Sequence, residues 1–502
     1  MFSRLFRGVA PLLLLLPAAA AAQPDGPITP ADLRRHIEVL ASDAFGGRAP
    51  GSDGEQRTIN YIAEQLRLRG LEPAGEGGGW FQPVVLVERA TVSQRVAWSV
   101  GGRALPFDQG DAALQGRDAE VRITDAPVIF AGHGARIPDR GIDQLAGADL
   151  RGAVVILLFD GPNVPGFPSF TDRVRSVTEA GAAAVIAVAG ADVQWQFVNR
   201  NFQRPATKLA SQTVAPVVGA MPIAAAQRLV AAAGGDFERL LNDQPGSSFR
   251  AVALPLRAEI EVMTTVRPTT THNVVGRLRG SGEGGESLLY LGHWDHFGTC
   301  RPEGEADRIC NGAVDNASGI AAMIEIAGRL ARAPRPVRDI LFLATTAEEL
   351  GLLGAEYFAG HPTVPLPSIV AAINLDTVAI HPAGEPVAVI GRGVPALDAV
   401  IDATVAAMGR RLDTDEEAAS FVERQDGWAL TRAGVPAVMV GGSFSDMALL
   451  QAFLSGPYHA PNDETGPRLM LDGAAEDANL LVALGRRLAD PAAYRPPASS
   501  RR

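Results

Sequence analysis

Apolar residues recur at helical spacing in the first part of the chain, and this pattern predicts two helices. Residues 30–40 carry apolar side chains on one face, and Thr29 followed by Pro30 is typical of a helix start. A second helical pattern, with apolar positions three and four residues apart, ends at Gly70. A glycine-rich stretch at residues 75–79 then leads into an apolar, strand-like run at residues 83–87.

From about residue 89 to residue 267 the pattern changes to short strand-like runs, separated by loops rich in glycine and proline. The runs cover residues 121–123, 126–130, 153–159, 183–188 and 215–218. This stretch lacks charged clusters of a catalytic kind, and His133 is its single histidine. We therefore expect residues 89–267 to form an inserted, mostly β domain without chemistry of its own.

After about residue 271, apolar strands alternate with helical patterns. Strands are predicted at residues 273–278, 288–292, 339–345, 369–375, 387–390 and 437–440, and helices at residues 318–332, 396–408 and 473–488. This alternation favours the α/β class, with a mixed, mostly parallel sheet covered by helices on both faces. We expect residues 23–88 and 268–490 to form this domain together, with residues 491–502 as a disordered tail. Ligands of such folds bind at the carboxyl ends of the strands.

Composition and charge exclude several classes of protein. The 502 residues are 47% hydrophobic and 20% charged, so the chain can bury large cores and is not intrinsically disordered. The formal net charge is −11, without the excess of Lys and Arg that phosphate backbones attract, so nucleic acid is not an expected partner. After the N-terminal segment, the sequence holds no run long and apolar enough to span a membrane.

The N-terminus has the pattern of a signal peptide, residues 1–22. Arg4 and Arg7 precede an apolar run at residues 12–16, and the alanines at residues 20–22 offer a cleavage point before Gln23. A membrane anchor is the alternative, but the run is shorter than the roughly 20 residues that a bilayer needs. No cysteine lies at the cleavage point, so a lipid anchor is excluded. The mature chain is expected in the periplasm or outside the cell.

The two cysteines, Cys300 and Cys310, are expected to form a disulfide. An oxidising compartment favours a bridge over a free thiol. Metal binding through sulfur is the alternative reading, but the spacing is wider than the usual zinc knuckle.

Polar residues with metal-binding chemistry gather where the predicted strands end. They are His293 and Asp295 after one strand, Glu348 and Glu349 after the next, Asp376 after a third, Asp315 in a loop before a helix, and Tyr458 with His459 late in the chain. Imidazole and carboxylate are good zinc ligands, and one carboxylate can bridge two ions about 3.5–4 Å apart. Asp295, two residues after His293, is spaced to accept the second N–H of that imidazole. Each motif alone is weak: a Glu-Glu pair is more often a solvated surface, and an aspartate before a helix is usually a cap.

Taken together, these segments resemble the di-zinc exopeptidase family that includes secreted bacterial aminopeptidases, glutamate carboxypeptidase II and transferrin-receptor-like proteins. The segments that carry the resemblance are GHWDHFG, NGAVDNASG, ATTAEELGLLGAEYF, INLDTVA and YHAPNDE, in the order of the family. Residues 45–52 and 80–82 also look like N-terminal signatures of the family, and the insert at residues 89–267 looks like a protease-associated domain.

The resemblance implies a role for each of these side chains. His293 and Asp376 would hold one Zn²⁺ and Glu349 and His459 the other, with Asp315 bridging the two ions. Glu348 would be the general base that activates a zinc-bound hydroxide, and Asp295 the partner of His293. Tyr458 would hydrogen-bond the developing oxyanion. Five other histidines lack such context and are expected to be structural or surface residues, namely His36, His133, His272, His361 and His381.

The expected function is a zinc-dependent aminopeptidase that acts on peptides and requires two Zn²⁺ ions. A glutamate carboxypeptidase-like enzyme is the alternative within the class, since Glu423 and Asp426 could hold an amine but Arg424 could hold a carboxylate. Glutaminyl cyclisation is disfavoured because it uses one zinc, and a receptor-like binding protein is disfavoured because no ligand is missing. Residues 425–427 depart from the Ser-Asp-His stretch of many relatives, so substrate preference does not carry over, and the sequence does not indicate the oligomeric state.

Overall fold

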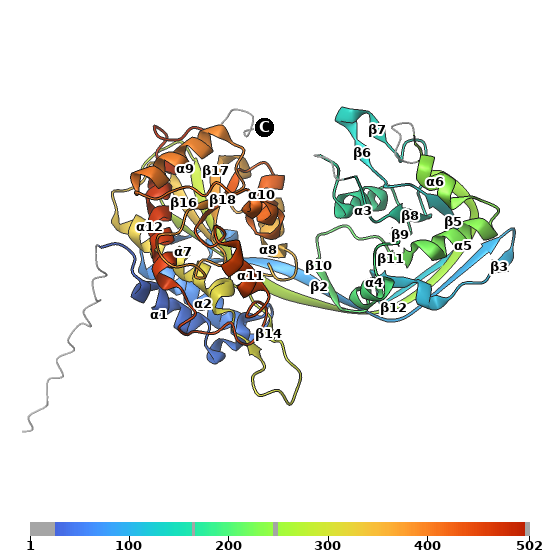
Figure 1. The fold of residues 1–502 in the computed structure, drawn as a ribbon, viewed down its shortest axis with the longest axis horizontal. Helices are drawn as coiled ribbons and strands as arrows, with labels where there is room; N and C mark the ends of the chain where they lie inside the picture. Colours follow the sequence, from blue (N-terminus) through green and yellow to red (C-terminus); the bar gives the residue numbers. More distant parts are fainter. Residues whose placement is uncertain (1–25, 163–165, 244–248, 497–502) are drawn as a thin grey trace, which may run out of the picture.

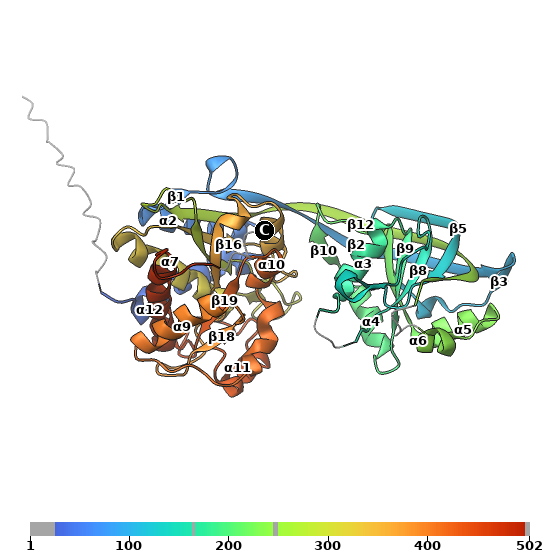
Figure 2. The ribbon, with the colours of Figure 1, turned by 90° about the horizontal axis from the view of Figure 1, so that it is seen from above.

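The computed structural model describes residues 26–162, 166–243 and 249–496. The predicted signal peptide, residues 1–22, lies outside this range. Figure 1 shows two lobes joined by two long strands, β2 (Phe81–Val100) and β12 (Val252–Leu278), and Figure 2 shows the same arrangement from above. We call residues 26–88 and 268–496 the α/β lobe and residues 89–267 the inserted lobe.

The α/β lobe is built on a mixed sheet with the strand order β18–β19–β17–β13–β16–β12. The central strand β13 runs parallel to β16 and β17, and β17 runs parallel to β19. The strands at both sides, β12 and β18, pair antiparallel with their neighbours. The bounds are β13 (Ser287–His293), β16 (Asp339–Thr345), β17 (Ile369–Asn374), β18 (Ala388–Ile390) and β19 (Ala437–Gly441).

Helices cover both faces of this sheet, as predicted, because its strands are apolar on both sides. Tyr290 of β13 belongs to the larger core, which α1, α2, α7, α9 and α12 complete. The next residue, Leu291, faces the opposite core with Phe358 of α8 and Leu430 of α10. The helices are α1 (Pro30–Leu40), α2 (Asp53–Leu68), α7 (Gly319–Arg332), α8 (Leu353–Gly360), α9 (Pro395–Ala407), α10 (Gly427–Arg432), α11 (Met447–Leu454) and α12 (Leu471–Leu488).

The first two helices begin at side-chain caps. The Thr29 hydroxyl accepts a hydrogen bond from the backbone N–H of Asp32, and the Asp32 carboxylate accepts one from the backbone N–H of Thr29, so two free N–H groups at the helix start are satisfied. Ser52 caps α2 in the same way through the backbone N–H of Glu55. Between them lies the short 3-10 segment η1 (Asp43–Arg48), which leads the chain toward the carboxyl ends of the strands.

The inserted lobe shares its sheet with the α/β lobe. Strands β2 and β12 pair antiparallel over most of their length and cross the predicted boundaries at residues 89 and 267 without interruption. The lobe contains β3 (Arg103–Leu105), β4 (Ala113–Gly116), β5 (Glu120–Phe130), β8 (Val154–Leu158), β9 (Ala184–Ala189), β10 (Ala206–Leu209) and β11 (Val217–Pro222). It also contains helices that the pattern did not predict: α3 (Phe170–Glu179), α4 (Trp195–Phe202), α5 (Ile223–Ala232) and α6 (Phe237–Asp243).

The remaining strands have two residues each: β1 (Glu72–Pro73), β6 (Arg136–Ile137), β7 (Ile142–Asp143), β14 (Gly298–Thr299) and β15 (Ile309–Cys310). The prediction of a disordered tail from residue 491 is wrong for residues 491–496. Tyr494 is 1% exposed, and its hydroxyl donates to the carbonyl of Val370. The prediction followed the polar and proline-rich composition of this segment and overlooked Tyr494, the aromatic residue that packs into the core.

Candidate metal centre

The predicted site residues come from the ends of neighbouring strands and from three loops. His293 is the last residue of β13, and Asp376 follows β17 by two residues. Asp315 lies in the loop before α7, and His459 lies in the loop after α11. Parallel strands bring their carboxyl ends to one edge of a sheet, so side chains that are far apart in sequence meet there.

A sharp turn after β16 carries the two neighbouring glutamates. Ala347 and Leu352 have φ angles of 53° and 61°, in the left-handed region that such residues rarely adopt. The turn is held from β12, because Asn273 accepts a hydrogen bond from the backbone N–H of Thr346. As a result, Glu348 lies near one histidine and Glu349 near the other: the closest oxygen–nitrogen distances are 3.9 Å to His293 and 3.0 Å to His459.

All five predicted ligands come together around Asp315. The Nε2 atom of His293 is 3.3 Å from Oδ1 of Asp315 and 3.5 Å from Oδ1 of Asp376. On the opposite side, Nε2 of His459 is 3.4 Å from Oδ2 of Asp315 and 3.0 Å from Oε2 of Glu349. One carboxylate therefore faces both histidines, one with each oxygen.

The donor set fits a metal centre. Asp315 is 3% exposed, yet its Oδ2 and the Nε2 atom of His459 have no hydrogen-bond partner within the described part of the chain. Single ligand atoms of His293, Asp315 and Glu349 lie within 4.8 Å of one another, and so do those of His293, Glu348 and Asp376. Cations stabilise buried carboxylates at this density, and imidazole with carboxylate is the ligand chemistry of zinc.

Burial and neighbouring carboxylates shift the ionisation of Glu348. Burial disfavours its charged form, and the carboxylates of Asp376, Asp426 and Glu349 add to this, so the pKa of Glu348 is raised well above its ordinary value although His293 opposes the shift. Burial likewise raises the pKa of Asp295 to about 8. These directions hold for the protein groups alone, because a bound cation would favour the charged carboxylates.

The predicted hydrogen bond from His293 to the Asp295 carboxylate is wrong in its atoms. Nδ1 of His293 is 3.2 Å from the backbone carbonyl oxygen of Asp295, whereas the nearest carboxylate oxygen is 3.9 Å away. The carboxylate instead accepts the backbone N–H of Glu348, with a nitrogen–oxygen distance of 3.1 Å. Asp295 therefore connects the histidine to the glutamate turn.

Tyr458 packs against the second histidine. Its ring stacks on that of His459 with centroids 3.5 Å apart. Burial, together with the carboxylates of Asp315 and Glu349, raises the pKa of the Tyr458 hydroxyl, so it remains a protonated hydrogen-bond donor. Its role toward an oxyanion stays a prediction.

Three further residues hold the site; the sequence indicates no role for His296 and Asn316, and suggests Asp426 only as a partner for a substrate amine. His296 is buried, and its Nδ1 is 2.6 Å from Oε1 of Glu349. Asn316 donates to the carbonyls of His293 and Leu375. Asp426, 1% exposed, accepts a hydrogen bond from Thr345 at the end of β16. The role of His296 could have been suspected from the sequence, because it lies three residues after His293. The contacts of Asn316 and Asp426 join segments that are distant in sequence.

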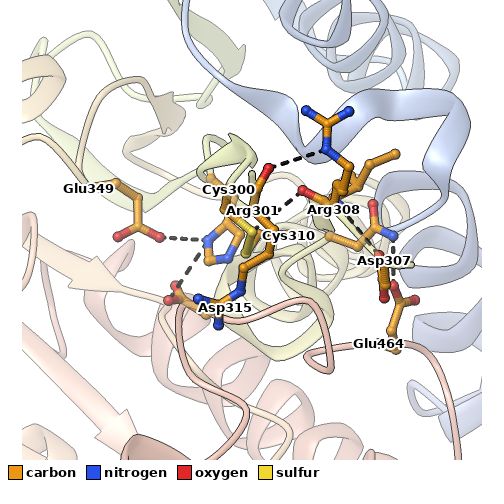
Figure 3. The surroundings of a disulfide bond; sticks show 11 residues. Cys300, Arg301, Asp307, Arg308, Cys310, Asp315, Glu349 and Glu464 are labelled. Atoms are coloured by element: carbon orange, nitrogen blue, oxygen red, sulfur yellow. Dashed lines mark hydrogen bonds and ion pairs between the residues drawn. A yellow bond between two sulfur atoms is a disulfide. The ribbon is translucent and has the colours of Figure 1, made fainter. Parts of the chain in front are cut away.

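The predicted disulfide is present and lies next to the centre. Cys300 and Cys310 are bonded. Cys300 follows the short strand β14, which pairs antiparallel with β15, the strand that ends at Cys310. Figure 3 shows the bridge beside Asp315 and Glu349, with Arg301 and Arg308 on the loop that it closes. The loop that carries Asp315 therefore begins directly after a covalent link.

The comparisons confirm the resemblance read from the motifs. Residues 273–479 match peptidase family M28. A probable zinc metalloprotease of Pyrenophora teres f. teres is 36% identical over 111 residues, which are 22% of this chain and 23% of that protein. A glutamate carboxypeptidase 2 homolog of Caenorhabditis elegans is 28% identical over 217 residues, covering 40% of this chain and 25% of that protein. The chain thus spans about a quarter of the length of these two relatives.

The fold is also similar to that of a solved structure over nearly its whole length. The aminopeptidase from Aneurinibacillus sp. strain AM-1 superposes with a TM-score of 0.51 at 17% identity, covering 94% of this chain and 96% of that chain. At 17% sequence identity this similarity shows a shared fold and nothing more. None of the described helices has the length and apolar character of a membrane span.

Proposed function

Because residues 273–479 form a peptidase family M28 domain, we propose that this chain is a zinc-dependent aminopeptidase that removes N-terminal residues from peptides. In this proposal His293 and Asp376 would hold one Zn²⁺, Glu349 and His459 would hold a second, and Asp315 would contribute to both. The observation that carries the proposal is the position of Asp315, whose two oxygens face one histidine each at 3.3 and 3.4 Å.

Bound zinc supplies Lewis-acid chemistry, polarising a carbonyl and acidifying a water. Glu348 then receives a proton at its carboxylate and transfers it to the leaving amine, as a general base and acid. Asp295 holds the backbone of Glu348 in place through the hydrogen bond to its N–H. The Tyr458 hydroxyl, which remains protonated, is available to donate to the oxyanion that develops on the substrate.

The charges around the site favour recognition of an amine over a carboxylate. The charged side chains with the largest effect on the ionisation of Glu348 include the carboxylates of Asp376, Asp426 and Glu349, which disfavour its negative charge, and His293, which favours it. Arg424, which could have bound a substrate carboxylate, is exposed, and its guanidinium lies over the ring of Phe421. A substrate ammonium group would be attracted to such a site, and a C-terminal carboxylate would be repelled.

The test is a panel of aminoacyl-nitroanilides and N-blocked dipeptides, assayed with and without a chelator. We expect hydrolysis of the free-amine substrates only, loss of activity on chelation and recovery with zinc. Cleavage of blocked substrates alone would replace the aminopeptidase by a carboxypeptidase, and activity that survives complete removal of metal would contradict the metal centre.

We also propose that the chain is exported after cleavage before Gln23. The proposal is supported by the disulfide, because such bonds persist in oxidising compartments. The N-terminal sequence of the mature protein from its native host tests this: a chain that retains Met1 would contradict it.

A further inference from the structure

Two buried side chains of opposite charge bind the backbone of the loop that ends at Asp315. One binds its carbonyl groups and the other binds its N–H groups. Residues 311–315 leave the disulfide at Cys310 and turn tightly: Gly312 has a φ of 55°, and a Cβ there would meet the ring of His296 at 2.7 Å. Residues 313–318 form the short helical segment η5 (Ala313–Ser318), and the backbone N–H groups at its start need partners outside it.

Arg48 binds the carbonyl groups of this loop. Its side chain is 1% exposed and donates to the carbonyls of Asn311 at 2.5 Å and Gly312 at 2.9 Å. The same guanidinium donates to the carbonyls of Leu40 and Trp294, and so joins the loop to α1 and to the segment after β13. Within the described residues no carboxylate lies at ion-pair distance from Arg48, so the hydrogen bonds of its guanidinium go to backbone carbonyl groups.

Asp463 binds the N–H groups of the same loop. Its carboxylate, on a residue that is 2% exposed, accepts the backbone N–H of Val314 at 2.9 Å and that of Asp315 at 3.1 Å. Its own carbonyl accepts the N–H of Ala313 at 3.0 Å. Asp463 follows His459 by four residues, so one short segment carries a proposed zinc ligand and the acceptor that orients the bridging ligand.

We propose that Arg48 and Asp463 are positioning residues for the metal centre, acting through the backbone of Asp315. This inference rests on the proposed function, because it assumes that Asp315 binds metal. Asp315 faces both histidines, so displacement of its loop disturbs both ions at once. Partners that orient a metal ligand commonly change metal affinity or activity by about 10- to 100-fold when they are replaced.

The test measures zinc affinity by competition with a chromophoric chelator for the wild type, Asp463→Asn and Arg48→Lys. Asparagine keeps the shape of Asp463 but offers one acceptor where two N–H groups need one each, and lysine cannot reach four carbonyls from one nitrogen. We expect zinc affinity to fall by about 10- to 100-fold in each variant. The visible absorption of the cobalt-substituted protein is expected to change in Asp463→Asn, because the ligand geometry is altered.

Glu325→Gln is the matched control. Glu325 is equally buried but bonds only to His36, Arg69 and Arg329, away from the loop. We expect this variant to lower the melting temperature of the metal-free protein and to leave zinc affinity within about threefold of wild type, a change far smaller than loss of an orienting partner causes.

The outcomes separate the two proposals. A wild-type protein that binds no zinc would overturn the proposed function, and this inference with it. A wild type that binds zinc, alongside folded Asp463→Asn or Arg48→Lys protein of equal affinity, would overturn this inference alone. So would an equal loss of affinity in Glu325→Gln, since the effect would then follow from general destabilisation. If Asp463→Asn does not fold, the Arg48→Lys measurement decides.

Discussion

Glu348 and Glu349 are adjacent in sequence but lie in different surroundings. The backbone N–H of Glu348 is bonded to Asp295, and its carboxylate lies near His293 without close contact. The carboxylate of Glu349 contacts His296 with one oxygen and His459 with the other. The turn after β16 produces this division, and it is consistent with a proton-transfer role for one glutamate and a ligand role for the other.

Replacing each glutamate by glutamine should therefore have different consequences. Glu348→Gln is expected to retain zinc but to lose at least about 10²-fold in kcat, since a general base contributes on that scale. Glu349→Gln is expected to lose zinc as well, because an amide is a poorer ligand than a carboxylate. Elemental analysis beside steady-state kinetics checks both; wild-type turnover in Glu348→Gln would show that another group is the base.

His381 should make stability depend on pH. It is buried, with Nε2 2.8 Å from Oδ2 of Asp477 and Nδ1 2.8 Å from the carbonyl of Pro382. Burial disfavours its charged form and Arg410 opposes it, but the Asp477 carboxylate outweighs both, so the pKa of His381 is raised above its ordinary value. Its stabilisation is fully present below the unfolded-state pKa and is lost as pH rises through the folded-state pKa.

The comparison is urea unfolding of the wild type and His381→Asn at about pH 5.5 and about pH 9, on either side of the ordinary histidine pKa. The wild type is expected to exceed the variant in free energy of unfolding by more at the lower pH. An equal difference at both pH values would show that folding does not raise the pKa of His381.

At the scale of elements, loops rather than strands complete the site. Strand β13 carries the proposed ligand His293 at its end, but the proposed ligands Asp315 and His459 lie on loops. Asp463 connects these two loops to each other, and Arg48 connects the first of them to the rest of the lobe. The disulfide closes the loop immediately before Asn311 and so shortens the segment that can move.

Removing the disulfide by replacing both cysteines with serine is expected to lower the free energy of unfolding by about 2–3 kcal/mol, the loop-entropy scale for a closed segment of this size. Denaturant unfolding of the double variant and of wild type, each with and without reductant, provides the measurement. The variant should not respond to reductant. A decrease in the free energy of unfolding below about 0.5 kcal/mol would indicate that removing the disulfide adds little conformational entropy to the unfolded chain.

At the scale of the whole molecule, the two lobes are connected by more than the strand pair. Arg432 of α10 contacts Asp172 of α3 in the inserted lobe at 3.0 Å, and Glu356 of α8 at 3.5 Å. Gln212 of the inserted lobe also donates to Glu356. Helix α8 begins four residues after Glu349, and α10 begins directly after Asp426, so the contact between the lobes lies on helices that follow residues of the candidate site.

Arg432→Gln is expected to shift the lobes toward separation with little change in overall stability. Its ion pairs are about one-third exposed, and such pairs contribute about 0.2–1 kcal/mol, enough for at most a roughly fivefold change in a population ratio. Fluorescence energy transfer between labels on the two lobes, at low and high salt, checks this. Arg151→Gln, whose ion pair with Asp149 lies within the inserted lobe, is the control. Equal transfer in both variants would contradict a role for Arg432 between the lobes.

The strands around the site could be predicted because they are continuous apolar runs that end at polar residues. The short helices α8 and α10 could not, since one or two turns do not establish a helical period. The paths of β2 and β12 through both lobes were also missed: charged residues such as Glu88 and Arg89 interrupt the apolar pattern, and their pairing partners lie far along the chain.

The sequence by itself identified the side chains that the proposed function uses. Imidazole and carboxylate groups at the ends of buried strands and at helix starts cost free energy unless they have a partner. This allowed five residues to be recognised: His293, Asp315, Glu349, Asp376 and His459. Only the tertiary structure decided which atoms face one another: that Asp295 bonds to the turn of Glu348, and that Arg48 and Asp463 share one loop between them. The physical reason is that hydrogen bonds act over about 3 Å, and the segments that come so close are selected by packing of the whole chain.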